Sequence, residues 1–308
     1  MLRFTIQRLL TGVPTLLVLI AAAFFLIRAA PGGPFDSERD LPPEIEANLR
    51  QAYHLDEPLP RQFARYLGNL ARGDFGPSLQ YRDFSVTELI RAGFPVSLRI
   101  GSLAMLRALL AGVSAGAWAA LRQNSAGDHL VMAAAMTGIS IPNFVMAPLL
   151  VLVVAVGLGW LPAGGYGGGA WRHLVLPVIT LALPQVAYLA RLTRASMIEV
   201  LSSPYIRTAR AQGLSSGRIL LRHALRPALL PVVSYLGPAT AAVITGSVVI
   251  EQIFGLPGIG RFFVTGALNR DYTLVMGVVV FYGALILLGN FLVDLVYGLL
   301  DPRIRHLS

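Results

Sequence analysis

The sequence predicts an all-helical integral membrane protein with six transmembrane helices and an external subdomain between the first two. Of its 308 residues, 55% are hydrophobic and 13% are charged, and the mean hydropathy is +0.64. Soluble domains have about 45–50% apolar and about 25% charged residues. In addition, several stretches without Asp, Glu or Arg approach or exceed the roughly 20 residues that cross a bilayer. Composition and patterning therefore both indicate a multi-pass membrane protein.

The apolar stretches place the spans one by one. The first, Leu9–Ile27, has 19 residues. The second, Ala108–Leu121, has only 14, and it reaches full length when it is extended back across Arg107 to about Ile100. Three later stretches have 18, 24 and 22 residues. With the third span described next, we expect spans at about residues 9–27, 100–121, 130–156, 173–190, 228–250 and 272–295.

The third span lies in a run of 43 residues, His129–Trp171, that is too long for one crossing. Its end, Gly157–Trp171, carries seven glycines and Pro162. Because unpaired backbone is not tolerated facing lipid, we expect one helix over residues 130–156, kinked near Pro142 and Pro148, and then an external Gly-rich loop.

Charge sets the orientation. Residues 191–226 hold seven arginines and one acid, Glu199, so the positive-inside rule places this loop in the cytoplasm. Arg3 and Arg8 hold the N-terminus on the same side. Six spans with both termini inside satisfy both constraints, and residues 31–93 then form the external subdomain. Ser78 should therefore face the outside and Ser215 the cytoplasm. A cleaved signal peptide is the alternative for residues 1–30, but its apolar stretch exceeds the usual 7–15 or so, so we expect an uncleaved first span.

Several kinds of chemistry are excluded. The chain has no Cys, and all 25 of its basic residues are Arg. Without Lys it lacks the phosphate-binding lysine of a Walker A loop, so any ATP must be bound by another chain, and we expect no cofactor and no enzymatic activity here. The five histidines have no metal-ligand spacing. No chain of charged residues crosses the membrane, which argues against a proton-driven secondary transporter.

Gly112-Val-Ser114-Ala-Gly116 matches the G-x-S-x-G pattern of a hydrolase nucleophile, which makes an intramembrane serine protease a second alternative. However, the pattern lies inside an apolar helix, where Gly-x-x-x-Gly allows close helix packing. We therefore expect packing.

The cytoplasmic loop contains a predicted short helix. Ser202 or Ser203 suits its N-cap, Pro204 its first turn and Gly213 the position just past its end. On this helix one side carries a small, partly apolar face with arginines around it, which is typical of a docking site. That face comprises Tyr205, Ala209 and Gln212, whereas Arg207 and Arg210 lie on another side. From composition alone, the alternative that this basic loop only contacts lipid phosphates remains open.

These residues carry a family resemblance. Thr208-Ala-Arg-Ala-Gln-Gly213-Leu, followed by His223-Ala-Leu-Arg-Pro227-Ala, resembles the EAA loop of the inner-membrane permeases of ABC importers, in its peptide-permease version. Further similar motifs extend over most of the chain: Gly73–Ser78, Phe94–Ser97, Met136–Gly138, Glu251–Gly260 and Leu268–Tyr272. External motifs within residues 31–35, 41–44 and 52–55 are similar to the B-subunit branch of the oligopeptide permeases.

The resemblance implies a type I ABC importer permease fold with a core over residues 94–297 and a cytoplasmic tail over 298–308. It also implies ATPase coupling through the loop, by Pro204, Tyr205, Arg207, Thr208, Ala209, Arg210, Gln212 and Gly213. The expected partners are a homologous second permease, two ATPase subunits that hold ATP and Mg, an external peptide-binding protein and membrane lipid, with no nucleic acid. The expected location is the bacterial inner membrane. Permeases for dipeptides, glutathione or nickel share the loop and remain alternatives.

Candidates for the external gate or the path are Arg107, Glu251, Phe254, Pro257, Gly258 and Asp271. From the residues alone, Arg107 has two open fates. It either extends to the outer headgroups from a lipid-facing position, or it faces the helix bundle or the path, where an intramembrane charge is usually functional.

Overall fold

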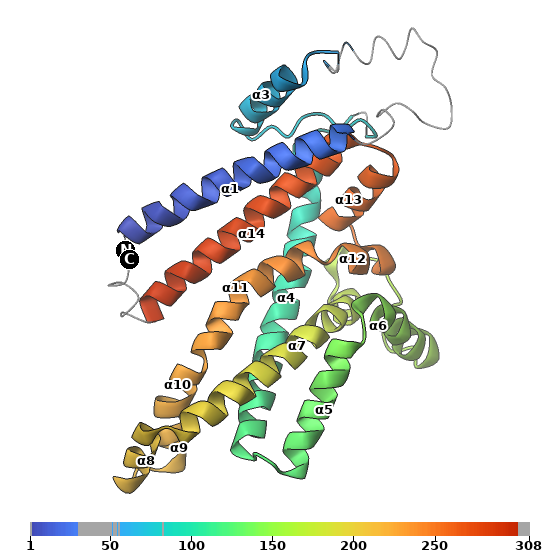
Figure 1. The fold of residues 1–308 in the computed structure, drawn as a ribbon. Helices are drawn as coiled ribbons and strands as arrows, with labels where there is room; N and C mark the ends of the chain where they lie inside the picture. The colour runs from blue at the N-terminus through green and yellow to red at the C-terminus, as the bar shows by residue number, and fades with distance from the viewer. Residues whose placement is uncertain (1, 30–50, 52–53, 55, 82, 301–308) are drawn as a thin grey trace. The chain divides into compact units, whose positions relative to one another are not determined.

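The computed structural model describes residues 2–29, 51, 54, 56–81 and 83–300, and in this part the chain is helical, which confirms the all-α prediction (Figure 1). Apart from the helices, one isolated β-bridge joins Pro77 to Ser85. The motifs in residues 31–35 and 41–44, most of 52–55, and the tail from residue 301 lie outside the described residues. The chain forms two compact units, and α1, α4 and α14 contribute residues to both.

The first unit comprises residues 1–5, 98–256 and 288–308. Its central helix is α7, because α4, α5, α6, α8, α10, α11 and α12 all contact it. The bounds of the elements in this unit are α4 (Val86–Leu121, from residue 98), α5 (Ala126–Ser140), α6 (Asn143–Leu150), a π-helical segment (Val151–Gly157), a 3-10 turn (Gly167–Gly169), α7 (Trp171–Ser202), α8 (Pro204–Ala211), α9 (Ser216–Arg218), a second π-helical segment (Ile219–Ala224), α10 (Leu225–Ala228), α11 (Leu230–Thr245) and α12 (Val248–Phe254).

Two glycines bring α4 close to α7. A Cβ at Gly112 would lie 2.7 Å from Leu189 Cβ, and one at Gly116 would clash with the carbonyl oxygen of Ala190. Ser114, between them, is exposed on a continuous helix rather than held in a turn between a strand and a helix. The packing interpretation of Gly112–Gly116 is confirmed. The G-x-S-x-G pattern therefore gives no support to the protease alternative.

The third expected span is broken rather than kinked. α5 and the helix that begins at Asn143 meet at an angle of 103°. The break falls at Ile141, whose φ of −88° and ψ of 116° are extended, as the residue before a proline prefers. Near Pro148, the second expected kink, the helix continues, and α6 passes directly into the π-helical segment at Val151.

The second unit comprises residues 6–97 and 257–287. It contains most of α1 (Leu2–Ala29), α3 (Leu59–Leu70), the start of α4, α13 (Ile259–Leu268) and the first part of α14 (Tyr272–Leu300). One apolar cluster joins Ile20 and Phe24 of α1 to Met276 and Val280 of α14, and α3 packs onto it. α3 lies within residues 31–93, the segment expected to form the external subdomain.

The described helices give between four and seven spans. Four are long and apolar enough to cross a membrane alone, and three bent pairs also qualify if each pair counts as one span. The expected span over residues 228–250 is divided between α11, which ends at Thr245, and α12. The largest extensions are at two helices, since α4 begins at Val86 and α7 continues to Ser202. Both helices extend past their apolar stretches because helix formation depends on backbone hydrogen bonds and not on lipid contact.

Candidate functional site

The predicted helix of the cytoplasmic loop is α8, Pro204–Ala211. Ser203 is its N-cap residue with an extended backbone, and Pro204 occupies the first helical position, where a missing N–H costs nothing. The Ser203 hydroxyl donates to the Val200 carbonyl instead of accepting from the helix, so its side chain does not cap α8. The boundaries of the prediction are confirmed, while side-chain capping by Ser203 is not.

Gly213 ends the helical turn with a left-handed backbone. Its φ is +76°, and the Leu214 N–H donates to the Ala209 carbonyl over 3.3 Å across the turn. Residues with a Cβ are disfavoured in this conformation. No atom lies within 4 Å of a Cβ built on Gly213, so the requirement for glycine here comes from backbone conformation and not from lack of space.

The inward side of α8 consists of Ile206 and Ala209, which are buried in an apolar cluster with residues of α7 and α10 and of the π-helical segment between α9 and α10. The predicted docking face is therefore wrong for Ala209, which packs inside this chain. Helical spacing gives relative positions on a helix but not the direction in which each side points. Tyr205 and Gln212 are exposed as expected, and the Tyr205 hydroxyl donates to the His223 carbonyl over 3.4 Å.

The outward side of the loop is cationic. Arg207, Arg210 and Thr208 are exposed on α8, and Arg218, Arg222 and Arg226 are exposed on the segments that follow. Figure 1 shows α8 at the end of α7, beside α9 and α10. The loop thus exposes guanidinium groups and the ring of Tyr205 on a helix whose inner side is packed in an apolar cluster.

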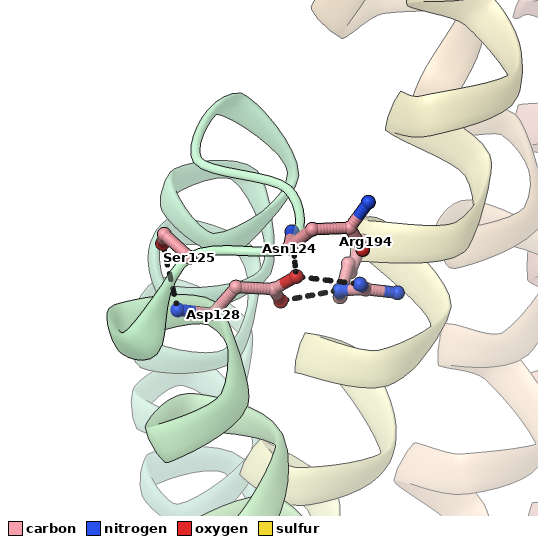
Figure 2. Close-up of polar contacts among 4 residues, drawn as sticks. All are labelled: Asn124, Ser125, Asp128 and Arg194. Atoms are coloured by element: carbon pink, nitrogen blue, oxygen red, sulfur yellow. Dashed lines mark hydrogen bonds and ion pairs between the residues drawn. The ribbon is translucent and has the colours of Figure 1, made fainter.

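On α7, nine residues before the N-cap of α8, Arg194 takes part in a buried ion pair that no motif in the sequence indicated. Asp128 of α5 accepts two hydrogen bonds from Arg194 of α7, of 2.5 Å from Nε and 2.6 Å from a terminal nitrogen (Figure 2). The Asn124 N–H also donates to Asp128 over 2.9 Å, while Ser125 caps α5 by accepting from the Asp128 N–H. The spacing Ser125-x-x-Asp128 is a recognisable helix start, but it does not reveal Arg194.

The pair is held largely away from solvent. Asp128 is fully buried and Arg194 is 24% exposed. The hydrogen bonds between them therefore fix the start of α5 on α7.

Two of the gate candidates, Glu251 and Phe254, are buried on α12. Glu251 accepts a hydrogen bond of 2.6 Å from the Ser247 hydroxyl. The Phe254 carbonyl accepts from the Gly165 N–H over 2.7 Å, and a Cβ at Gly164 would lie 2.9 Å from that carbonyl oxygen. The Gly-rich loop is thus attached to the end of α12, and the lack of a side chain at Gly164 allows this close approach.

The candidates Pro257, Gly258 and Asp271 belong to the second unit. Gly258 is the N-cap of α13 and is buried, and Pro257 is half-buried. Asp271 is 1% exposed, and its carboxylate accepts hydrogen bonds from the Ser78 hydroxyl and from three backbone N–H groups, those of Leu79, Gln80 and Leu274. In this arrangement Asp271 joins the segment before α4 to the start of α14, and both of its carboxylate oxygens accept hydrogen bonds within the chain.

Arg107 is the one gate candidate that is exposed; it projects from α4. Three of the six candidates lie in each unit. Four of them, Glu251, Phe254, Gly258 and Asp271, are buried. Among the described residues, no group of three or more His, Asp or Glu side chains is arranged to bind a metal.

Comparison with known proteins identifies the family. A model of the family described as "Binding-protein-dependent transport system inner membrane component" matches residues 112–306. The chain belongs to this family. A companion model of the N-terminal part of such membrane components matches residues 1–84 of this inner-membrane component. The family resemblance inferred from the sequence motifs is confirmed, and with several apolar helices the chain is a multi-pass inner-membrane protein.

Relatives of this inner-membrane component match along its whole length. It is 55% identical over 306 residues to the oligopeptide transport system permease protein OppB of Haemophilus influenzae, covering 99% of this chain and 100% of the relative. The OppB of Escherichia coli K12 is equally similar. The dipeptide transport system permease protein DppB of Bacillus subtilis is 45% identical over 305 residues, covering 99% and 98% of the two chains.

Solved structures share the fold. A chain of the MetNI methionine ABC transporter in an inward-facing conformation is similar with a TM-score of 0.57 at 17% identity, covering 69% of this chain and 96% of that one. A chain of an amino acid ABC transporter gives a TM-score of 0.55 at 18% identity, covering 68% and 94%. At this identity the likeness shows the fold alone, which is that of the type I ABC importer permeases.

Proposed function

We propose that this chain is a permease subunit of an ATP-driven importer and forms, with a second permease, the path for oligopeptides delivered by an external binding protein. The observation that carries the proposal is the 55% identity along the full chain to OppB permeases. The 45% identity to a dipeptide permease supports the class and keeps dipeptides as the alternative substrate. The absence of Lys agrees with a nucleotide site on partner subunits.

We propose that α8 is the point where an ATPase subunit docks. The proposal is supported by the way α8 is held: Ile206 and Ala209 attach its inner side to the chain, and Tyr205, Arg207 and Arg210 are free to meet a partner. Pro204, Thr208, Gln212 and Gly213 shape the helix ends or its outer surface. Two ATPase subunits, one for each permease, would hold ATP and Mg.

We further propose six spans with both termini in the cytoplasm. The four long helices and two of the bent pairs, Ala126–Gly157 and Ser216–Thr245, make up this number. The third bent pair, Val248–Leu268, contains Glu251, Phe254, Pro257 and Gly258, and we assign it to the external gate as a re-entrant segment. Asp271 follows it and would fix the gate to the external subdomain through Ser78.

The test is purification of the tagged chain from cells that also express the second permease, the ATPases and the binding protein encoded with it. Both ATPases and the second permease should co-purify. After reconstitution into liposomes, the complex should take up oligopeptides only with ATP and binding protein. Uptake by the isolated chain under an ion gradient would instead establish a secondary transporter, and uptake of dipeptides alone would establish the alternative substrate.

A further inference from the structure

α4 has two opposite faces between residue 98 and its C-terminal end. One face packs inside the first unit, where Gly101 lies against Ile244 of α11, and Gly112 and Gly116 lie against α7. The opposite face is exposed and carries apolar side chains, among them Leu106 and Leu110. What distinguishes this exposed face is the set of polar side chains that it also carries.

Four polar residues are exposed on that face: Arg99, Ser102, Arg107 and Ser114. At 100° per residue, Arg99, Arg107 and Ser114 fall within an arc of about 80°, and Ser102 lies on the flank of the same face, about 60° from Arg99. We call these four residues the α4 polar face. Arg99, Arg107 and Ser114 lie opposite the glycines that pack against α7 and α11, and Ser102 lies on the side nearer to them.

The outer end of the polar face adjoins the Gly-rich loop. A Cβ at Gly169 would lie 2.7 Å from an Arg99 guanidinium nitrogen and 3.1 Å from the Tyr166 hydroxyl. Gly169 has a φ of +85°, so glycine both permits the turn and leaves room for the guanidinium. Arg107 lies eight residues further along α4, about 12 Å at 1.5 Å per residue. That separation is the length of an extended peptide of about three to four residues.

The polar face has positive charge and few acids around it. Residues 98–256 contain three acids, Asp128, Glu199 and Glu251. Asp128 pairs with Arg194, Glu251 bonds to Ser247, and Glu199 lies on α7 beside the cytoplasmic loop. Among the described residues, no ion pair engages Arg99 or Arg107. Within residues 98–256, this face therefore carries two guanidinium groups that none of the three carboxylates pairs with.

From this we infer that the α4 polar face lines the translocation path and that Arg107, with Arg99 at the outer end, binds the carboxylates of the passing peptide. The inference rests on the proposed function. A mostly apolar wall with a few placed polar groups is typical of a ligand-lining surface. A guanidinium forms two parallel hydrogen bonds with a carboxylate, whether this is the C-terminus or an acidic side chain.

Lipid is the competing occupant of this face, and its polar residues argue against it. A lipid-facing helix exposes apolar side chains, whereas here the hydroxyl groups of Ser102 and Ser114 accompany two arginines among the leucines. Intramembrane arginines that face lipid extend to the headgroups, which requires no hydroxyl neighbours. A partly polar face opposite a packed one instead suits a water-containing path.

The experiment compares three peptides in liposomes that contain the whole importer and saturating binding protein. The probes are trialanine, trialanine amide and Ala-Glu-Ala, which carry one, no and two carboxylates. For Arg107→Leu, the ratio of variant to wild-type uptake should fall about five- to tenfold for trialanine and Ala-Glu-Ala and stay near one for the amide. Arg99→Leu should change the ratios in the same order by a smaller factor. Ratios to wild type cancel the different affinities of the binding protein for the three probes.

Two further variants of the same helix serve as controls. Arg107→Lys keeps the charge and should restore most of the preference for carboxylates, while Leu110→Ala removes an exposed apolar side chain and should change the three ratios equally. Normal uptake of all probes by Arg107→Leu would show a lipid-facing arginine, and an equal loss of all three would show a structural role; either result overturns the inference. If the wild-type importer takes up none of the probes, the proposed function fails instead.

Discussion

Asp128 of α5 and Arg194 of α7 are 66 residues apart in sequence and form an ion pair with two hydrogen bonds. Arg194 lies nine residues before Ser203, the N-cap of α8. The carboxylate is fully buried, so the hydrogen bonds from Arg194 replace those that water would otherwise donate to it. The pair fixes the start of one membrane helix to the helix that leads into the candidate docking loop.

Replacing Asp128 by Asn should lower the thermal unfolding midpoint of the permease by about 2–5 °C, because the charged hydrogen bonds to Arg194 are lost. The measurement is the unfolding midpoint of the purified complex in detergent, followed by tryptophan fluorescence. Arg194→Lys is the matched variant: it keeps the charge but loses the planar fork, so its midpoint should fall by less. An unchanged midpoint for Asp128→Asn would mean that the pair contributes nothing to stability.

Gly213→Asp should abolish peptide uptake while the protein still inserts and accumulates. A residue with a Cβ costs about 1 kcal/mol at a left-handed φ, and the new charge would lie at the end of the cationic α8. Gly217 offers a matched control in the same loop, because it is exposed, has no atom within 4 Å of a built Cβ and does not require a positive φ. Gly217→Asp should retain most uptake. Equal uptake by both variants would argue that the loop meets lipid rather than an ATPase.

Topology can be tested on single cysteines because the chain has none of its own. Cysteine at Ser215, which is exposed, should be protected from a membrane-impermeant thiol reagent in intact cells. Cysteine at Ala71, exposed at the end of α3, should be labelled. Ser78, which the sequence analysis offered as the external reporter, is unsuitable because it is 1% exposed and bonded to Asp271. Labelling at Ser215 together with protection at Ala71 would show that the chain has the opposite orientation in the membrane.

Local signals explain what the sequence could predict. Pro204 and Gly213 mark the ends of α8 because each residue type fits only certain backbone conformations. The Gly112–Gly116 contact was predictable for a similar reason, since glycine in an apolar helix indicates close approach. Helix existence and helix ends follow from such residues without any knowledge of neighbours.

What escaped prediction depends on distant neighbours. Ser78 and Asp271 are separated by 193 residues, and neither is marked locally as a partner of the other. The burial of Ala209 depends on the cluster that α8 meets. At Pro142 the sequence indicated a change of direction, yet the 103° bend depends on how α6 packs against α7 and α12.

The fastening of α8 has a mechanical consequence. Its inner residues, Ile206 and Ala209, share one apolar cluster with Met197 of α7, which precedes it, and with Ala228 of α10, which follows it. Only Ser203 lies between α7 and α8, so there is almost no slack on that side. A force applied to the outer side of α8 should therefore reach both α7 and α10, because both pack against its inner side.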